Sequence, residues 1–230
     1  MRKLALIIIA LSIANLGQAP AVKGGTVTGT VVAVSKGKPI KTTDVWVYLE
    51  GTAAPKASVG EGVTANIVQK DTEFTPKVVV IPKGGKVFFP NRDPEEHNVF
   101  SPAVKKNDYF GFDLGRYGPD KKGRHRKFFE LGEFDIYCDI HKDMWSKVKV
   151  VPTRYFTRVV DGKFTLTGVV PGTYTLVAWA PDSRESRSAQ PFEVKANETR
   201  AAESLNVQYV MSTGGHRRVD GSEYPPYPQR

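Results

Sequence analysis

This 230-residue sequence has little cysteine, histidine or methionine: one Cys, four His and three Met. A single cysteine cannot form a disulfide within the chain, which excludes a disulfide-stapled fold. The one long apolar run lies within the first 21 residues, and no second run is long enough to span a membrane. No stretch has the apolar periodicity of a long amphipathic helix, so the sequence does not predict a helical fold.

The first 21 residues have the features of an export signal. Arg2 and Lys3 precede a mostly apolar stretch that ends near Leu16, and Ala19-Pro20-Ala21 offers a small-x-small cleavage site. We therefore predict that residues 1–21 are removed and that the mature protein, which has no membrane span, is periplasmic, with secretion as the alternative.

Positive charge exceeds negative charge, with 33 Lys and Arg against 24 Asp and Glu. This excess favours acidic partners but does not by itself indicate nucleic acid, and no nucleic-acid partner is predicted. Five of the seven residues 121–127 are cationic. We interpret this run as an exposed surface loop, with a docking patch for an acidic redox partner as the alternative.

Short segments with period-two alternation dominate the chain. The predicted strands are residues 27–34, 45–49, 78–81, 87–89, 133–138, 147–151, 164–166, 173–178 and 205–210. Turn residues separate them, and Asp161-Gly162 is a strong signal for a two-residue hairpin loop. The sequence therefore predicts an all-β fold built from antiparallel β-sandwiches.

Residues 132–144 contain the most informative pattern. Alternation places Phe134, Ile136 and Cys138 on one face of a strand. The chain then leaves the strand through a tight loop that presents His141 and Met144. A thiol, an imidazole and a thioether therefore occur within seven residues of one another.

A second imidazole is expected to reach the same place. His97 shares a strand face with Val99, so its ring can point inward from the start of that strand. A thiolate, two imidazoles and a distant thioether form the ligand set of a blue-copper electron-transfer site. Alternatives remain at this point: Cys138 could be a buried structural thiol or pair with another chain, and zinc also accepts Cys and His.

Residues 66–152 resemble the cupredoxins, the family of plastocyanin, azurin and amicyanin. The spacing Cys-x2-His-x2-Met matches the short ligand loop of amicyanin-type members. The resemblance implies a Greek-key β-sandwich that holds one type 1 copper ion through His97, Cys138, His141 and, weakly, Met144. It also implies that Asn98 ties the two ligand loops together by hydrogen bonds, and that the exposed edge of His141 is the electron exit.

The flanks resemble the two halves of a carboxypeptidase-regulatory-like (transthyretin-like) sandwich, in residues 25–49 and 161–176. We predict one such sandwich that is split by insertion of the cupredoxin, an arrangement that resembles methylamine-utilisation-type proteins. The predicted parts are 22–65, first half of the outer sandwich; 66–152, cupredoxin; 153–210, second half; and 211–230, a disordered tail in which His216 has no specific role.

These features predict an exported one-electron carrier rather than an enzyme. Multicopper oxidases and copper nitrite reductases share such a site but need further His residues, usually paired as His-x-His. Only His125 and His216 remain, and they are not paired. The expected partner is an acidic redox protein, a cytochrome or a dehydrogenase. The alternative function is a copper-binding or copper-delivery protein, or a non-redox binding module of the cell envelope.

Overall fold

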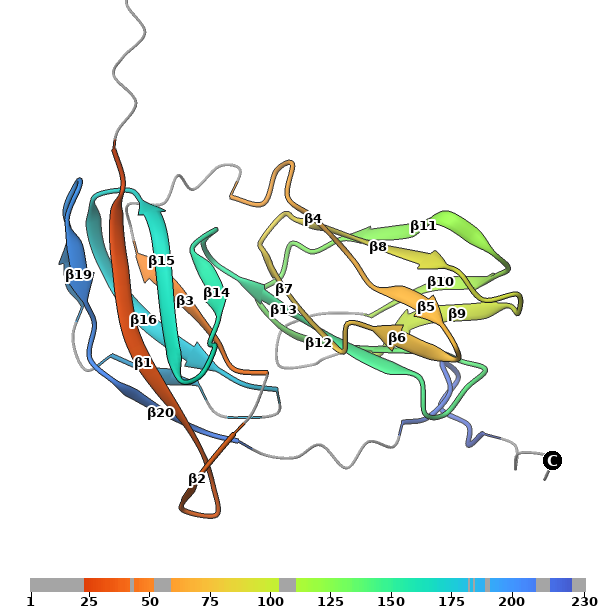
Figure 1. Ribbon diagram of the computed structural model, residues 1–230. Coiled ribbons are helices and arrows are strands. Elements are labelled where there is room, and N and C mark those ends of the chain that lie inside the picture. Colours follow the sequence, from red (N-terminus) through yellow and green to blue (C-terminus); the bar gives the residue numbers. More distant parts are fainter. Residues whose placement is uncertain are drawn as a thin grey trace, which may run out of the picture.

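The computed structural model describes residues 23–41, 44–51, 59–103, 111–181, 183, 185–188, 191–209 and 216–224. The predicted export signal lies outside these residues. The regular structure of the described residues is entirely β and forms four five-stranded sheets, which pack as two β-sandwiches (Figure 1). The predicted all-β fold with two sandwiches is therefore confirmed. The described residues contain no helix long and apolar enough to cross a membrane.

The inserted sandwich is made of β4 to β13. Its first sheet has the order β10 (Phe112–Tyr117), β9 (His97–Ser101), β12 (Gly132–Tyr137), β13 (Trp145–Val151), β7 (Val78–Pro82). Its second sheet has the order β11 (Asp120–Lys127), β8 (Lys86–Asn91), β5 (Val68–Lys70), β6 (Glu73–Thr75), with β4 (Thr64–Asn66) also paired to β8.

The outer sandwich is made of β1 to β3 and β14 to β20. In its first sheet, β1 (Gly25–Ser35) pairs with β15 (Lys163–Val169), β19 (Thr199–Ala201), β2 (Lys38–Ile40) and β20 (Leu205–Gln208). Its second sheet has the order β14 (Phe156–Arg158), β3 (Trp46–Gly51), β16 (Gly172–Trp179), β17 (Ser186–Arg187), with β18 (Phe192–Val194) also paired to β16.

Both sheets of the outer sandwich combine strands from before and after the inserted sandwich. β1 runs antiparallel to β15, and β3 lies between β14 and β16. The sandwich is therefore split, as the sequence indicated. The hairpin between β14 and β15 also forms as predicted: Asp161 and Gly162 have φ of 48° and 74°, and Val160 and Lys163 pair across the turn.

Each sandwich has its own apolar core, and a third cluster joins them. The joining cluster consists of Tyr48, Val78, Val80, Val151, Val177 and Trp179. It packs the outer face of β7 and β13 against β3 and β16. Because these side chains come from both sandwiches and are buried, the apolar contact between the two sandwiches is continuous.

Buried charges surround this joining cluster. Lys149 is 5% exposed, and its Nζ lies 2.6 Å from Oε1 of Glu185. The hydroxyl of Tyr48 donates to the same carboxylate oxygen at 2.7 Å. The indole of Trp179 donates to Glu133 at 2.7 Å. These bonds give the buried polar groups partners, which avoids the cost of leaving a charge uncompensated.

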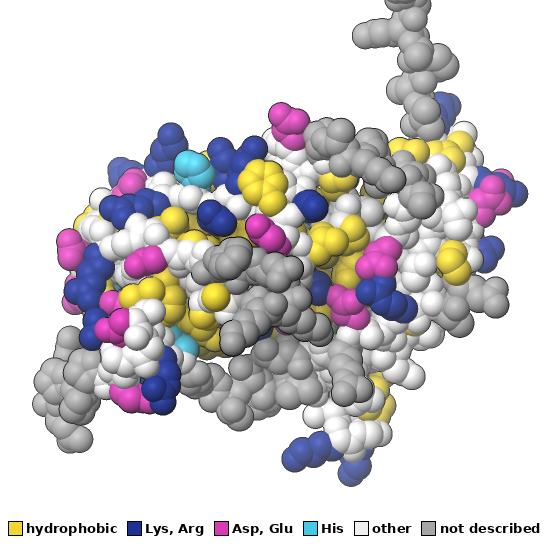
Figure 2. Space-filling model, turned by 180° about the vertical axis from the view of Figure 1, so that it is seen from behind, with side chains coloured by type: hydrophobic (Ala, Val, Ile, Leu, Met, Phe, Trp, Pro, Cys, Tyr) yellow, Lys and Arg dark blue, Asp and Glu magenta, His cyan; other side chains and the backbone are white. Residues whose placement is uncertain are grey.

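The interpretation of residues 121–127 as a loop is wrong. They form most of β11, an edge strand paired with β8. Most of its side chains are exposed on both faces of the strand, so no apolar alternation marks it as a strand. The expected exposure of this charged run is nevertheless observed. Figure 2 shows Lys and Arg side chains gathered on part of the reverse face, with acidic side chains among them.

Candidate metal centre

Two neighbouring strands bring two of the predicted ligands, His97 and Cys138, together. β12 ends at Tyr137, one residue before Cys138, and β9 begins at His97. The two strands are paired in one sheet, with Tyr137 opposite Phe100. As predicted, Phe134, Ile136 and Cys138 share a buried face and have no exposed surface. The sheet therefore places the thiol and the first imidazole at the same end of the sandwich.

A tight loop then presents the second imidazole. The Met144 N–H donates to the His141 carbonyl at 3.2 Å, and the Cys138 N–H donates to the Met144 carbonyl at 3.2 Å. These two bonds fold the loop back on the end of β12. His141 therefore lies beside Cys138, at the partly exposed edge of the cluster.

The ligand atoms of three residues converge. Nδ1 of His97 lies 3.2 Å from Nδ1 of His141, and the Cys138 Sγ lies 3.7 Å from the same His141 atom. All three ligand atoms lie within 4.8 Å of one another. One sulfur and two imidazole nitrogens fit copper or zinc, because thiolate and imidazole are ligands that both metals accept.

Met144 and Asn98 lie around this group. Met144 is fully buried in the same core cluster as Cys138, and its role as a weak ligand stays a prediction. The Asn98 Oδ1 accepts a bond from the N–H of Asp139 at 3.1 Å, and its Nδ2 donates to Asp113 at 2.6 Å. Asn98 thus links β9 to the first residue after Cys138.

The surroundings of Cys138 favour its thiolate. Burial by itself raises the pKa of the thiol, but the His97 ring and the backbone N–H groups of Asn98 and Ile140 outweigh it, so the pKa lies below its usual value. The N–H of Ile140 lies 3.4 Å from the sulfur. A thiolate is the form that binds a metal, so these groups prepare the sulfur for that role.

Asp93 is a functional residue that the sequence reasoning missed. Its Oδ2 lies 2.6 Å from Nε2 of His97, the ring nitrogen that faces away from the cluster. Backbone N–H groups of Asp71 and Thr72 donate to the same carboxylate at 2.6 and 3.0 Å. Burial raises the pKa of Asp93, yet these donors and His97 lower it below its usual value. The only signal in the sequence was an aspartate four residues before the histidine.

The two imidazoles differ in their pKa. Burial lowers the pKa of His97, but the neighbouring Cys138 and Asp93 outweigh it and raise it above the usual value. The pKa of His141 is lowered by burial and by the adjacent His97 ring. His141 is therefore the more readily neutral of the two rings, and a neutral ring is the form that binds a metal.

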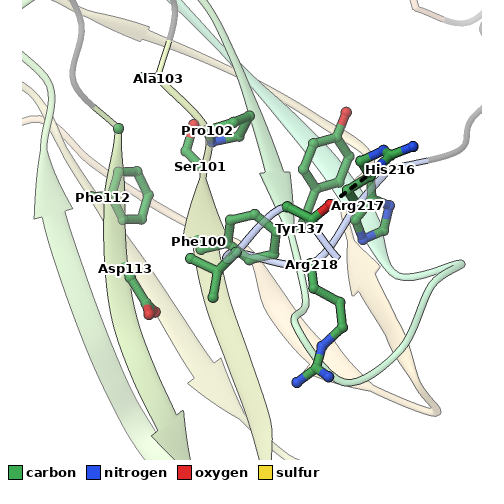
Figure 3. A pocket seen from close by; sticks show the side chains of 13 residues that line it. Phe100, Ser101, Pro102, Ala103, Phe112, Asp113, Tyr137, His216, Arg217 and Arg218 are labelled. Carbon is green, nitrogen blue, oxygen red and sulfur yellow. Dashed lines mark hydrogen bonds between the residues drawn. The ribbon is translucent and has the colours of Figure 1, made fainter. Parts of the chain in front are cut away.

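Residues 216–224, part of the segment that the sequence predicted as a disordered tail, also reach this site. Residues 216–224 lie against β12, and the ring of His216 stacks on that of Tyr137 with 3.9 Å between centroids and 8° between planes. A pocket of about 560 Å³ remains between this segment and the strands that carry Phe100 and Phe112 (Figure 3). The sequence predicted no specific role for His216. The structure gives its ring contacts with Tyr137 and the Cys138 carbonyl, which no periodic pattern in residues 216–224 indicates.

His125 lies outside the cluster of His97, Cys138 and His141. Its exposed ring lies on β11 and contacts Phe88, with 5.3 Å between the ring centroids. Of the four histidines, all of them described, His97 and His141 are the two in the cluster.

Comparison with known families gives one match. Residues 149–202 match the model of polysaccharide lyase family 4, domain II, a segment that includes β14 to β19 of the outer sandwich. No curated protein sequence matches this chain.

Solved structures are similar to part of the chain. Amicyanin from Paracoccus versutus is 20% identical, with 45% of this chain and 98% of the amicyanin covered, at a TM-score of 0.35. A purple cupredoxin from Nitrosopumilus maritimus is 25% identical, with 38% of this chain and 99% of that protein covered, at a TM-score of 0.30. A copper-containing nitrite reductase from Thermus scotoductus SA-01 is 23% identical over 39% of this chain, at a TM-score of 0.35; the match spans 22% of that protein's length.

Proposed function

We propose that this chain is an exported type 1 (blue) copper protein that carries single electrons between redox partners. The observation that carries the proposal is the convergence of one sulfur and two imidazole nitrogens within 4.8 Å, in a cluster whose His97 and Cys138 are fully buried. Copper bound there would supply a one-electron couple between Cu(II) and Cu(I). His97, Cys138 and His141 would hold it, with Met144 as a weak additional ligand.

The chain's own residues suit this task in three ways. The lowered pKa of Cys138 keeps the sulfur ready as a thiolate. Asp93 holds the far nitrogen of His97, which fixes the orientation of that ring. Main-chain hydrogen bonds hold the loop that carries His141 against the end of β12, which suits a site whose ligands must stay in place when its charge changes.

His141 is the proposed exit for the electron, because it is the partly exposed member of the cluster. The proposed partner is an acidic redox protein, since β11 offers exposed Lys and Arg side chains that steer an acidic surface at low salt. The proposed location is the periplasm, based on the export signal predicted at residues 1–21. Apart from His97 and His141, the sequence has only His125 and His216, which do not form the His-x-His pairs that oxidases need. We therefore propose a carrier and not an oxidase.

The experiment that tests this function is an absorption and spin-resonance spectrum of the copper-loaded mature protein. We expect an intense visible thiolate-to-copper band together with one copper per chain. A copper-loaded protein without that band contradicts the proposal.

A copper-delivery protein is distinguished by its kinetics. A buried, preformed site should release copper slowly and exchange electrons quickly between copies, whereas a delivery site should do the reverse. Rapid loss of copper to a chelator combined with slow self-exchange would favour delivery over electron transfer.

A further inference from the structure

Residues 216–224, which we name the C-terminal strap, lie against the inserted sandwich. The strand that precedes the strap in the sequence, β20, belongs to the outer sandwich (Figure 1). Figure 3 shows His216, Arg217 and Arg218 of the strap next to Tyr137, the last residue of β12. The strap is thus held where the metal-binding loop begins.

Two side chains of the strap bind the main chain of the thiol-bearing residue. The hydroxyl of Tyr224 donates to the Cys138 carbonyl oxygen at 2.5 Å, and Nε2 of His216 lies 3.3 Å from the same oxygen. The two strap rings also contact each other, with their centroids 5.2 Å apart. A buried carbonyl with two partners is strongly fixed in direction.

The strap also holds the next residue along the chain. The N–H of Val219 donates to Oδ1 of Asp139 at 3.0 Å, and Arg218 lies 3.2 Å from its Oδ2. Arg116 of β10 contacts the same carboxylate at 3.0 Å. Asp139 is 6% exposed, so its carboxylate depends on these charge-assisted bonds for partners, whereas the side chains of Arg116 and Arg218 stay partly exposed.

Together these bonds fix the main chain of Cys138 on both sides of its Cα. Its N–H is bonded to Met144 within the ligand loop, and its carbonyl is bonded to the strap. The direction of the Cα–Cβ bond follows from the main chain, and that bond aims the sulfur. The contacts of Tyr224 and His216 with the Cys138 carbonyl therefore also influence where the sulfur lies.

We propose that the C-terminal strap is a positioning element of the metal centre. Tyr224 and His216 hold the Cys138 carbonyl, orient its sulfur toward His97 and His141, and cover this side of the ligand loop against solvent. Ligand-supporting bonds of this kind tune metal sites. The effect on the metal rests on the proposed copper function, but the effect on the sulfur does not.

The first test uses the metal-free mature protein. Cys138 is the only cysteine, so its rate of alkylation by iodoacetamide reports on this site alone. We expect alkylation several-fold faster in Tyr224→Phe, which removes one hydroxyl, and faster still in a chain that ends at Tyr209. The matched control is Tyr209→Phe in the outer sandwich, which should alkylate at the wild-type rate.

Circular dichroism and thermal unfolding show whether each variant keeps its fold. If the shortened chain does not fold, Tyr224→Phe and His216→Ala decide the question. Equal alkylation rates in the wild type and in every folded strap variant overturn the proposal.

The second test uses the copper-loaded protein. Tyr224 and His216 direct the positive ends of their hydrogen-bond dipoles toward the site. This favours Cu(I), which carries less positive charge than Cu(II). We expect Tyr224→Phe to bind one copper per chain with a shifted thiolate-to-copper band and a lower reduction potential, while Tyr209→Phe changes neither. An unchanged band and potential in Tyr224→Phe contradict the positioning role.

The two proposals fail in different ways. A wild-type protein that shows no thiolate-to-copper band disproves the copper function, and the alkylation rates still decide whether the strap positions the sulfur. A blue wild-type protein whose strap variants match it in alkylation rate and potential supports the copper function and disproves the strap.

Discussion

Nε2 of His97 lies 2.6 Å from Oδ2 of Asp93, and both groups are largely buried. The other ring nitrogen of His97 faces His141 at 3.2 Å. The His97 imidazole is thus held by a carboxylate on one side and faces Cys138 and His141 on the other. This is the arrangement by which proteins fix the tautomer of a metal-binding histidine and raise its basicity.

Replacing this carboxylate should weaken metal binding. Asp93→Asn keeps the size of the side chain but removes its charge, so His97 loses its fixed orientation. We expect copper affinity to fall about 10–100-fold, measured by competition with a chelator. Asp71→Asn, which changes an exposed aspartate in the neighbouring turn, is the matched control and should bind copper as the wild type does.

Removing the sulfur should abolish the colour. In Cys138→Ser the thiolate is absent, so the intense thiolate-to-copper absorption should disappear even when copper is present by mass spectrometry. A purified copper form that keeps this band after the substitution would show that Cys138 is not a ligand.

Changing the thioether should alter the potential and not the colour. A harder amide oxygen in Met144→Gln favours Cu(II), so the reduction potential should fall while the thiolate band remains. Cyclic voltammetry measures the change. A potential equal to that of the wild type means that Met144 is not a copper ligand.

The interface between the sandwiches should be sensitive to acid. Burial raises the pKa of Glu185, but Lys149 and Tyr48 outweigh it and lower the pKa below its usual value. A carboxylate with a lowered folded-state pKa stabilises the protein above its unfolded pKa of about 4.3. That stability is lost as the pH falls through the folded-state value.

Glu185→Gln should remove this contribution. We expect the free energy of unfolding at pH 7 to fall by about 1–3 kcal/mol, and its dependence on pH below about 4.3 to become flatter. Urea unfolding at a series of pH values measures both effects. Glu193→Gln, an exposed glutamate on β18, serves as the control, and an identical pH profile in the two variants would contradict the prediction.

The joining cluster should contribute strongly to stability. Trp179 is fully buried between the sandwiches and donates to Glu133, so Trp179→Ala creates a cavity and leaves that carboxylate without the bond. We expect a loss of about 3–5 kcal/mol in urea unfolding. Phe129→Ala, at a side chain that is 53% exposed, should change stability by less than about 0.5 kcal/mol.

Local patterns in the sequence predicted the parts of the site that depend on neighbouring residues. Alternation located the buried face of β12 and hence Cys138, because a strand with one buried face must alternate. The spacing in the next loop located His141. The Asp161-Gly162 turn was predictable for a similar reason, since both residues tolerate positive φ.

The missed features depend on contacts between distant residues or on main-chain pairing. Tyr224 lies 86 residues from its partner Cys138 in the sequence, and its segment carries no periodic pattern. β11 is held to β8 by main-chain hydrogen bonds while its side chains face solvent, so its sequence shows charge and not alternation. Asp93 contacts the ring of His97 from a turn in which its own N–H donates to Asn91, and no local pattern in the sequence indicates that contact.

The hydroxyl of Thr153 donates to the carbonyl of Leu49 at 2.6 Å, although 104 residues separate them. The polypeptide therefore leaves the outer sandwich and returns to it at nearly one point. The folded inserted sandwich connects these two points as a short rigid bridge. A long flexible loop in its place would lose more conformational entropy when the outer sandwich closes. Folding of the inserted sandwich therefore contributes to the stability of the outer sandwich that contains it.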